Sequence, residues 1–400
     1  MSAAAERGSP HPFIRYRWLL DSYRKAIGRG WSDGDFVSLV TRLDEAIAGV
    51  EGHGFSVTPL SRQDRLAASL GIGSAPLWVK DETGNVGGSH KARHLFGVLL
   101  HLAIDEEDES ELAIASCGNA AVAAAVVARA VERPLRVFIP TWADPAVVQR
   151  LELLGARIEV CERRPDELGD PAFLRFLDSV QLGARPFSVQ STITETTLDG
   201  GRTIGWELAE QLALARAHGT IELFVQVGGG ALAASLWRGL TDGIREQWLD
   251  ADPVLITVQT EATAPLNRAW RRLQAWSDDY NVGLDEADFT EATMSQAHEN
   301  SDAFMQPWET VGMSAASGIL DDVTYDWLPV TEAMIRSGGM PLVVNEEMIL
   351  RANEIGRSST GINVDHTGTA GLAGLLGREA TSSFDPAHHV VVLFTGVQRT

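Results

Sequence analysis

Cysteine, lysine and basic charge in general are scarce in this chain of 400 residues. Two cysteines are too few for a disulfide framework or a four-cysteine zinc site. Lys and Arg number 33 against 54 Asp and Glu, so the formal net charge is −21, and such an acidic surface repels nucleic-acid backbones and anionic lipids. Charges also interrupt every apolar run before the ~20 residues that a membrane helix needs. We therefore expect no nucleic-acid partner and no membrane span.

Composition and the first residues favour a cytoplasmic globular protein. Apolar residues make up 44% of the chain and charged residues 22%, which is close to the globular average, and the length suits two domains. The start, MSAAAERGSPHPF, lacks the basic and then apolar order of a secretory signal. The low cysteine content also suits a reducing compartment.

Short apolar runs alternate with longer amphipathic or alanine-rich stretches through most of the chain. The expected strands are Leu77–Val79, Leu112–Ala115, Leu135–Ile139, Arg157–Val160, Ile221–Val227, Val254–Thr257 and Val390–Phe394. The expected helices include Lys91–Leu102, Ala120–Val131, Ala146–Leu154 and Ala231–Leu240. Strands that alternate with helices are typical of parallel sheets covered on both faces, so the sequence predicts an α/β fold.

The same pattern predicts the domain organisation. Residues 1–55 are amphipathic and contain no predicted strand, so we expect a helical N-terminal extension. Residues 93–185 have the pattern of a small α/β domain that is inserted into a large domain of residues 56–92 and 186–400. The acidic and polar residues 278–300 are expected to form a surface excursion.

A triple-glycine segment follows one predicted strand. Gly228, Gly229 and Gly230 lie between that strand and a helix that begins with Ala231 and Leu232. Glycines let backbone N–H groups approach an anion closely, and the positive end of the helix adds to the attraction, so phosphate is a plausible ligand. The spacing matches neither the nucleoside-triphosphate loop nor the dinucleotide fingerprint. A plain strand-to-helix turn that needs small residues is the alternative.

Lys91 lies at the start of a predicted helix and is one of only three lysines, with Lys25 and Lys80. The helix dipole disfavours a cation at this end and so favours the free amine that a Schiff-base lysine must present. A solvated lysine at a helix start is the alternative. His90 and His94 are four residues apart and could share a helix face, but no third ligand is spaced nearby, so we expect no metal site.

Two further groups lie at the ends of predicted strands. Ser116, Cys117, Gly118 and Asn119 bring a hydroxyl, a thiol, an amide and several N–H groups to a helix start, which suits a carboxylate. The alternatives are a simple helix cap and, for the thiol, a nucleophile. Thr395 follows the last predicted strand and could equally be an edge-strand residue.

Together and in this order, these motifs resemble the fold-type-II pyridoxal-phosphate enzymes. That group includes threonine synthase, the serine and threonine dehydratases, cystathionine β-synthase and the tryptophan synthase β chain. The resemblance runs from about residue 59 to the end of the chain. It rests on S-x-K-x-R at 89–93, S-x-G-N-A at 116–120, the triple glycine and the C-terminal T-G, with further similar stretches at 77–82, 199–204, 337–339 and 367–372.

The resemblance implies two domains, each a twisted and mostly parallel sheet flanked by helices, with pyridoxal phosphate in the cleft between them. Lys91 would hold the cofactor as an internal aldimine and then shuttle the Cα proton. Asn119 would bond the cofactor's 3′-oxygen, and Thr395 would face its pyridine nitrogen. The remaining implied contacts are a phosphate cradle at Gly228–Leu232, a substrate-carboxylate loop at Ser116, Cys117 and Gly118, and His90 beside the lysine as an acid, a base or a substrate contact.

The implied activity is that of a pyridoxal-phosphate lyase on an α-amino acid, by α,β-elimination or β-replacement through an aminoacrylate. A threonine-synthase-like γ-elimination and β-replacement on a phosphorylated homoserine is one alternative, and a catalytically silent paralogue that binds an amino acid or the cofactor is another. The family is usually dimeric. Ala120 stands where dehydratases commonly carry histidine, Cys117 replaces the usual Ser, Thr or Ala, and Asp365-His366 replaces the frequent Glu-Pro.

Overall fold

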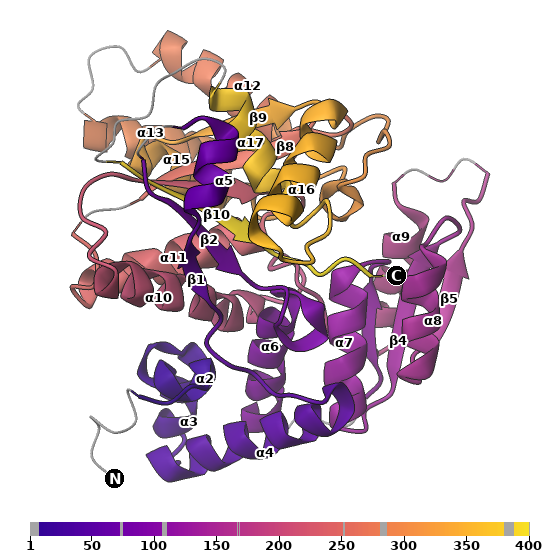
Figure 1. Ribbon diagram of the computed structural model, residues 1–400. Coiled ribbons are helices and arrows are strands. Elements are labelled where there is room, and N and C mark those ends of the chain that lie inside the picture. Colours follow the sequence, from indigo (N-terminus) through magenta and orange to yellow (C-terminus); the bar gives the residue numbers. More distant parts are fainter. Residues whose placement is uncertain are drawn as a thin grey trace. The chain divides into compact units, whose positions relative to one another are not determined.

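The computed structural model describes residues 8–72, 75–105, 110–165, 167, 169–250, 253–280, 286–379 and 388–399. The chain forms two compact units, each built on a sheet of mostly parallel strands flanked by helices, so the predicted α/β class is confirmed (Figure 1). The first unit comprises residues 1–58, 84–207 and 399–400, and the second comprises 59–83 and 208–398. In the described part of the chain, no helix is both long and apolar enough to cross a bilayer.

The first unit contains a four-stranded parallel sheet in the order β5-β4-β3-β6. Phe176 of α9 packs with Phe138 of β4 and Ala113 of β3, all almost fully buried, so α9 covers one face of this sheet. Its elements are α2 (Pro12–Arg15), η1 (Arg17–Leu19), α3 (Asp21–Gly28), α4 (Asp33–Glu51), η2 (Val86–Gly88), α6 (Lys91–Asp105), β3 (Leu112–Ala115), α7 (Asn119–Ala130), β4 (Leu135–Pro140), α8 (Pro145–Leu153), β5 (Arg157–Cys161), α9 (Pro171–Gln181), β6 (Arg185–Pro186) and most of α10 (Thr197–Leu214).

The second unit contains a six-stranded sheet in the order β1-β2-β10-β7-β8-β9, in which only β1 runs antiparallel. Its elements are β1 (Leu60–Arg62), α5 (Asp64–Leu70), β2 (Leu77–Asp81), β7 (Ile221–Gln226), α11 (Ala231–Arg245), β8 (Val254–Thr260), α12 (Pro265–Tyr280), α13 (Glu286–Glu299), α14 (Ser301–Phe304), η3 (Ser317–Ile319), α15 (Trp327–Ser337), β9 (Met340–Val344), α16 (Glu346–Thr360), α17 (Ala370–Glu379) and β10 (His389–Phe394).

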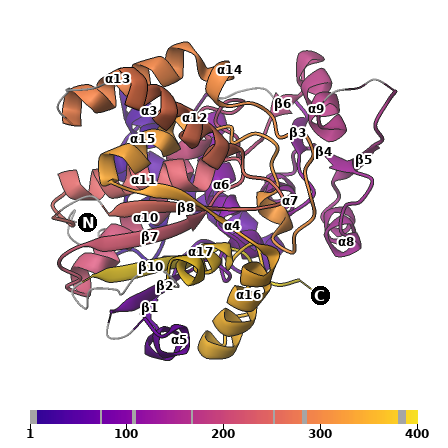
Figure 2. The same ribbon diagram turned by 90° about the horizontal axis from the view of Figure 1, so that it is seen from above.

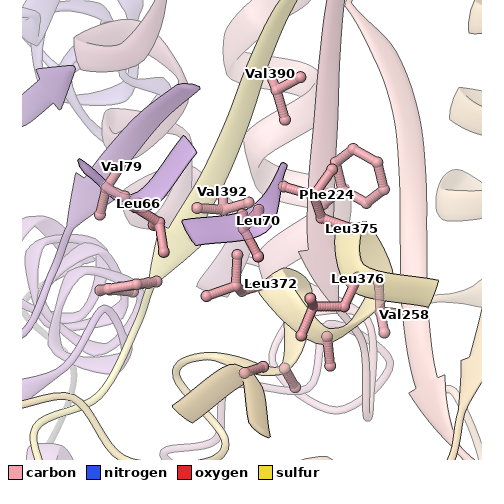
Figure 3. Close-up of a cluster of buried hydrophobic side chains, with 14 of the residues drawn as sticks. Leu66, Leu70, Val79, Phe224, Val258, Leu372, Leu375, Leu376, Val390 and Val392 are labelled. Atoms are coloured by element: carbon pink, nitrogen blue, oxygen red, sulfur yellow. The ribbon is translucent and has the colours of Figure 1, made fainter. Parts of the chain in front are cut away.

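The strand order of the second unit dictates where its helices lie. The chain moves outward from β7 to β8 to β9 and then returns to β10 on the other side of β7. Because parallel crossovers are right-handed, α11 and α15 cover one face of the sheet, and α16 and α17 cover the other. Figure 3 shows the core on the second face, where Phe224 and Val392 meet Leu372 and Leu375 of α17. α5 completes this layer beside α16 (Figure 2).

The described residues before β1 form α2, η1, α3 and α4, which belong to the first unit. Phe13 and Phe55 stack edge-on with each other and pack on Phe96 of α6. The carboxylate of Asp199 accepts the backbone N–H groups of Asp21 and Ser22 at 2.9 Å each, at the start of α3. Residues 8–58 therefore pack with 84–207 in one compact unit. The division into folding domains stays a prediction.

Each predicted strand overlaps an observed strand, whereas β1, β6 and β9 were not anticipated. The described part of the expected surface excursion at 278–300 contains α13. This helix packs on α15, buries Met294 and Ala297 and leaves Glu291, Ser295 and His298 exposed. Residues 281–285 of that stretch lie outside the described residues.

Candidate active site

Apart from His90 and Lys91, the predicted site residues follow strands at which the order of each sheet reverses. In the first unit, β4 and β5 lie on one side of β3 and β6 on the other, and Ser116–Asn119 follow the carboxyl end of β3. In the second unit, the reversal falls between β7 and β10, and the triple glycine and Thr395 follow these two strands. Ligands of open α/β sheets bind at such positions, because the neighbouring loops diverge there and leave a crevice.

The turn that leads to Lys91 is pressed against α7. Gly87 has a φ of +65°, in the left-handed region, and a Cβ there would lie 3.3 Å from the Cα of Ala123. Only glycine fits both the conformation and the contact without strain. The Asn85 side chain accepts the N–H of Val86 at 2.9 Å and starts the turn. Lys91, which is half-buried, then opens α6, and α6 packs on α7.

The three lysines have different environments. The Lys25 ammonium pairs with Asp105 at 2.6 Å on the surface of the first unit. The fully buried Lys80 donates to Oε1 of Gln211 at 3.0 Å within the second unit. Lys91 is the first residue of α6, where the dipole of the helix disfavours a cation. A nucleophilic role for Lys91 stays a prediction.

Both histidines near the lysine are buried. Burial, followed by repulsion from the charge of Lys91, lowers the pKa of His94 to about 3, so this ring is neutral at physiological pH. Its Nδ1 donates to the carbonyl oxygen of Thr197 at 3.0 Å. The ring of His90 lies edge-on to that of His94, with centroids 5.9 Å apart. Among the described residues, no three His, Cys, Asp or Glu side chains are grouped as metal ligands.

Arg93, two residues after Lys91 in the first turn of α6, is a residue to which the motif alone assigned no role. Its guanidinium makes two hydrogen bonds to Glu207, at 2.7 and 3.0 Å, and further bonds to the hydroxyls of Thr58 and Thr203. The side chains of Arg93 and Glu207 are 1% and 0% exposed. This buried network anchors the first turn of α6, and with it Lys91, to α10.

The loop after β3 lies next to the lysine turn. The Gly118 N–H donates to Oγ of Ser116 at 3.4 Å, and α7 begins at Asn119 rather than at Ala120. The guanidinium of Arg399 donates to Oδ1 of Asn119 and, at 2.6 Å, to the carbonyl oxygen of Gly87. One side chain therefore joins the two motifs, and the sequence contained no signal for it.

Cys117 of this loop is half-buried and forms no disulfide. The other cysteine, Cys161, is buried at the end of β5, and burial raises the pKa of its thiol to about 11. A thiol of so high a pKa is a poor nucleophile at neutral pH. Cys161 packs in the buried cluster of Phe138 and Phe176, whereas Cys117 lies beside the predicted site residues.

The triple glycine forms a tight turn into the N-terminus of α11. Gly230, with a φ of +99°, caps this helix of 15 residues. A Cβ on Gly228 would lie 2.9 Å from the Cα of Ile319 and would also collide with a carboxylate oxygen of Asp321. The hydroxyl of Thr324 donates to the carbonyl oxygen of Gly228 at 3.0 Å and so holds the glycine turn in place. The segment from Ile319 to Thr324, which the sequence did not single out, therefore packs on the turn.

Thr395 is 2% exposed, and its neighbours determine its hydrogen bonding. The amide nitrogen of Gln226 donates to Oγ1 of Thr395 at 2.7 Å and to the carbonyl oxygen of Gly368 at 3.0 Å. Since Gln226 lies two residues before the triple glycine, Thr395 and the turn belong to one cluster in the second unit. Asp365 joins it, because its N–H donates to the carbonyl oxygen of Gly396 at 2.9 Å.

These residues fit the cofactor that the motifs suggest. The first unit offers a lysine at a helix start and, at Ser89, a fully buried hydroxyl with no hydrogen-bond partner among the described residues. The second unit offers a glycine turn that any Cβ would obstruct, at the start of a long helix, which suits a phosphate. The carboxylate of Asp321 lies against the same turn, so its negative charge would repel a phosphate bound there.

The chain is similar to known proteins in sequence. A family model described as pyridoxal-phosphate dependent enzyme matches residues 53–396. An L-serine dehydratase of Saccharomyces cerevisiae is 29% identical over 232 residues, which cover 54% of this chain and 64% of that protein, less than two thirds of its length. A threonine synthase of Methanosarcina acetivorans is 27% identical over 321 residues, which cover 80% of this chain and 68% of that protein.

The chain is also similar to solved structures in its fold. Maize serine racemase superposes with a TM-score of 0.62 at 17% identity, and the match covers 90% of this chain and 94% of the racemase. The processed form of threonine deaminase isoform 2 from Solanum lycopersicum superposes with a TM-score of 0.65 at 16% identity, and the match covers 92% of this chain and 86% of the deaminase. At these identities the likeness concerns the fold alone.

Proposed function

Because the chain belongs to the pyridoxal-phosphate dependent enzymes, we propose that it acts on an α-amino acid by α,β-elimination or β-replacement. The position of Lys91 carries this proposal. Of three lysines, it alone opens a helix beside a second motif at a sheet switch point, whereas Lys25 is ion-paired and Lys80 is buried against Gln211.

In this proposal Lys91 binds the cofactor covalently and moves the proton at Cα of the substrate. When bound, pyridoxal phosphate withdraws electrons from Cα of the substrate amine and so makes the Cα proton acidic. His94 stays neutral, so it does not add a charge beside the amine. The Ser116–Gly118 loop binds the substrate carboxylate through N–H groups at the start of α7, and His90 lies next to the lysine as a substrate contact or proton carrier.

Thr395 is proposed to direct the reaction toward loss of a β group. Its oxygen accepts from Gln226, so its own proton is directed to another partner, and a hydroxyl donor pairs with an unprotonated pyridine nitrogen. A neutral nitrogen withdraws less charge than a protonated one. Expulsion of the β leaving group is then favoured over transamination. Asn119 is assigned to the 3′-oxygen and Gly228–Leu232 to the phosphate.

Reductive trapping tests the covalent assignment directly. Borohydride treatment of the cofactor-loaded protein, followed by peptide mass spectrometry, should label Lys91 and neither of the other two lysines. Lys91→Ala should lose the visible absorbance of the bound cofactor and keep its circular dichroism, whereas Lys25→Ala, the matched control, should keep both. A label on Lys25 or Lys80 would refute the assignment.

A panel of amino acids tests the reaction class. Release of ammonia and a keto acid from serine or threonine would establish elimination. A new amino acid formed from serine, or from an O-activated serine, with an added nucleophile would establish replacement. If no amino acid is turned over although Lys91 is labelled, the chain is the silent cofactor-binding paralogue and the proposed activity is wrong.

Threonine-synthase-like chemistry on a phosphorylated homoserine is the second candidate. Two observations favour it: the threonine synthase is matched over 80% of this chain, and Ala120 follows Asn119 where dehydratases commonly carry histidine. Release of phosphate and threonine from O-phosphohomoserine, with no turnover of serine, would establish it in place of the first candidate.

We also propose that the protein is a cytoplasmic homodimer whose substrate is an amino acid, a small molecule. The low cysteine content, with no disulfide between the two cysteines, supports a reducing compartment. Light scattering coupled to size-exclusion chromatography would test the dimer, and fractionation of cells that express the chain would test its location. A monomer, or a membrane-associated fraction, would contradict these assignments.

A further inference from the structure

Arg399 joins the lysine turn to the start of α7. Its two terminal nitrogens donate separately, one to Oδ1 of Asn119 and the other to the carbonyl oxygen of Gly87 at 2.6 Å. Gly87 lies four residues before Lys91, and Asn119 is the first residue of α7. The planar guanidinium holds two acceptors at a fixed separation, which a lysine ammonium cannot do.

This contact determines which end of the Asn119 amide is available to a ligand. A guanidinium has donors only, so the Asn119 atom that faces it must be the oxygen. The NH₂ group of the same amide therefore points elsewhere and can only donate. A ligand atom that pairs with that end of Asn119 must be an acceptor, such as the 3′-oxygen of pyridoxal phosphate in its anionic form.

We infer that Arg399 is a positioning residue that orients Asn119 toward the 3′-oxygen of the cofactor. The inference rests on the proposed role of Asn119. Arg399 also adds a positive charge behind the amide, and a cation favours the anionic state of a nearby oxygen. The second bond, to the carbonyl oxygen of Gly87, holds the guanidinium itself in place, so that it faces the amide of Asn119.

A double-mutant cycle on the full chain tests this role. Arg399→Gln should weaken cofactor binding by about tenfold, the effect of losing one charge-assisted hydrogen bond. It should also raise the pH midpoint at which the visible absorbance of the lysine-bound cofactor changes, because the nearby cation is gone. Arg399→Lys should recover part of both effects. In an Asn119→Ala background, Arg399→Gln should change the dissociation constant by less than about twofold, because coupled residues are not additive.

Arg357 provides a matched control, since it donates to Oδ1 of Asn363 at 3.1 Å on an exposed face of the second unit. Arg357→Gln should leave the dissociation constant and the pH midpoint unchanged. The role of Arg399 would be refuted if Arg399→Gln bound the cofactor as well as or better than the parent chain, or if its effect persisted in the Asn119→Ala background. A parent chain that bound no cofactor at Lys91 would instead refute the proposed function.

Discussion

The buried pair of Arg93 and Glu207 allows a quantitative prediction about the lysine-bearing turn. The two side chains are 1% and 0% exposed, and two parallel hydrogen bonds of 2.7 and 3.0 Å join them. Removal of one partner from such a pair leaves an unpaired buried charge, which costs about 3–5 kcal/mol. We therefore expect Arg93→Met to lower the free energy of unfolding by about 4 kcal/mol, a large share of the ~5–15 kcal/mol of an ordinary domain.

The loss of unfolding free energy in Arg93→Met should depend on whether the residue at position 207 is charged. Its Oε2 also accepts the N–H and the hydroxyl of Thr58, each at 3.0 Å, so a glutamine there keeps an acceptor and removes the charge. The double variant Arg93→Met with Glu207→Gln should recover to within about 2 kcal/mol of the parent chain. Arg93→Lys should fall between parent and Arg93→Met, because an ammonium cannot make the paired hydrogen bonds.

Urea unfolding followed by circular dichroism measures these differences, and cofactor binding provides a second readout. Arg93→Met should bind the cofactor less well at temperatures where the chain is still folded, because the first turn of α6 carries Lys91. A loss of stability below about 1 kcal/mol, the range of an exposed ion pair, would refute the reasoning. So would a double variant as unstable as Arg93→Met alone, since the cost would then not come from the unpaired charge.

Three further changes follow from the site. Asp321→Asn removes the carboxylate beside the triple glycine and should tighten pyridoxal phosphate binding by about threefold to tenfold, with no change for unphosphorylated pyridoxal, in a titration by absorbance; equal gains for both ligands would contradict the proposed phosphate site. Thr395→Asp should protonate the pyridine nitrogen and divert turnover to pyridoxamine phosphate, measured by chromatography, whereas unchanged products in a cofactor-loaded variant would exclude Thr395 from the nitrogen. Burial lowers the pKa of His94 to about 3, so the unfolded chain takes up a proton below pH ~6.5 and stability falls by about 1.4 kcal/mol per pH unit from there toward pH 3. Urea midpoints between pH 7.5 and 5 should show a shallower fall in His94→Gln, and an unchanged slope would contradict the burial of a neutral ring.

The amino-acid sequence by itself determined the α/β class and the motifs, because both depend on local patterns of apolar, glycine and polar residues. β-branched runs at 221–227 and 390–394 became β7 and β10, and the residues that follow them, the triple glycine and Thr395, lie where the sheet order reverses. Period and composition identify such strands since a strand buried on both faces needs a continuous apolar run. The sequence pattern does not predict β9, because Pro341 and the preceding Gly338 and Gly339 interrupt its short apolar run.

Only the tertiary structure decided which distant residues support the site. Arg399 meets Asn119 across 280 positions, and the N-terminus of α3 meets Asp199 across 178. Burial alone would raise the pKa of Asp199, but the hydrogen bond from His101 and the charge of Arg202 hold that pKa well below its usual range, so the docking carboxylate stays charged. None of these partners has a local signature, because a hydrogen bond depends on where the folded backbone brings two groups. Sequence periodicity specifies which elements form, whereas sheet order and side-chain packing specify which of them meet.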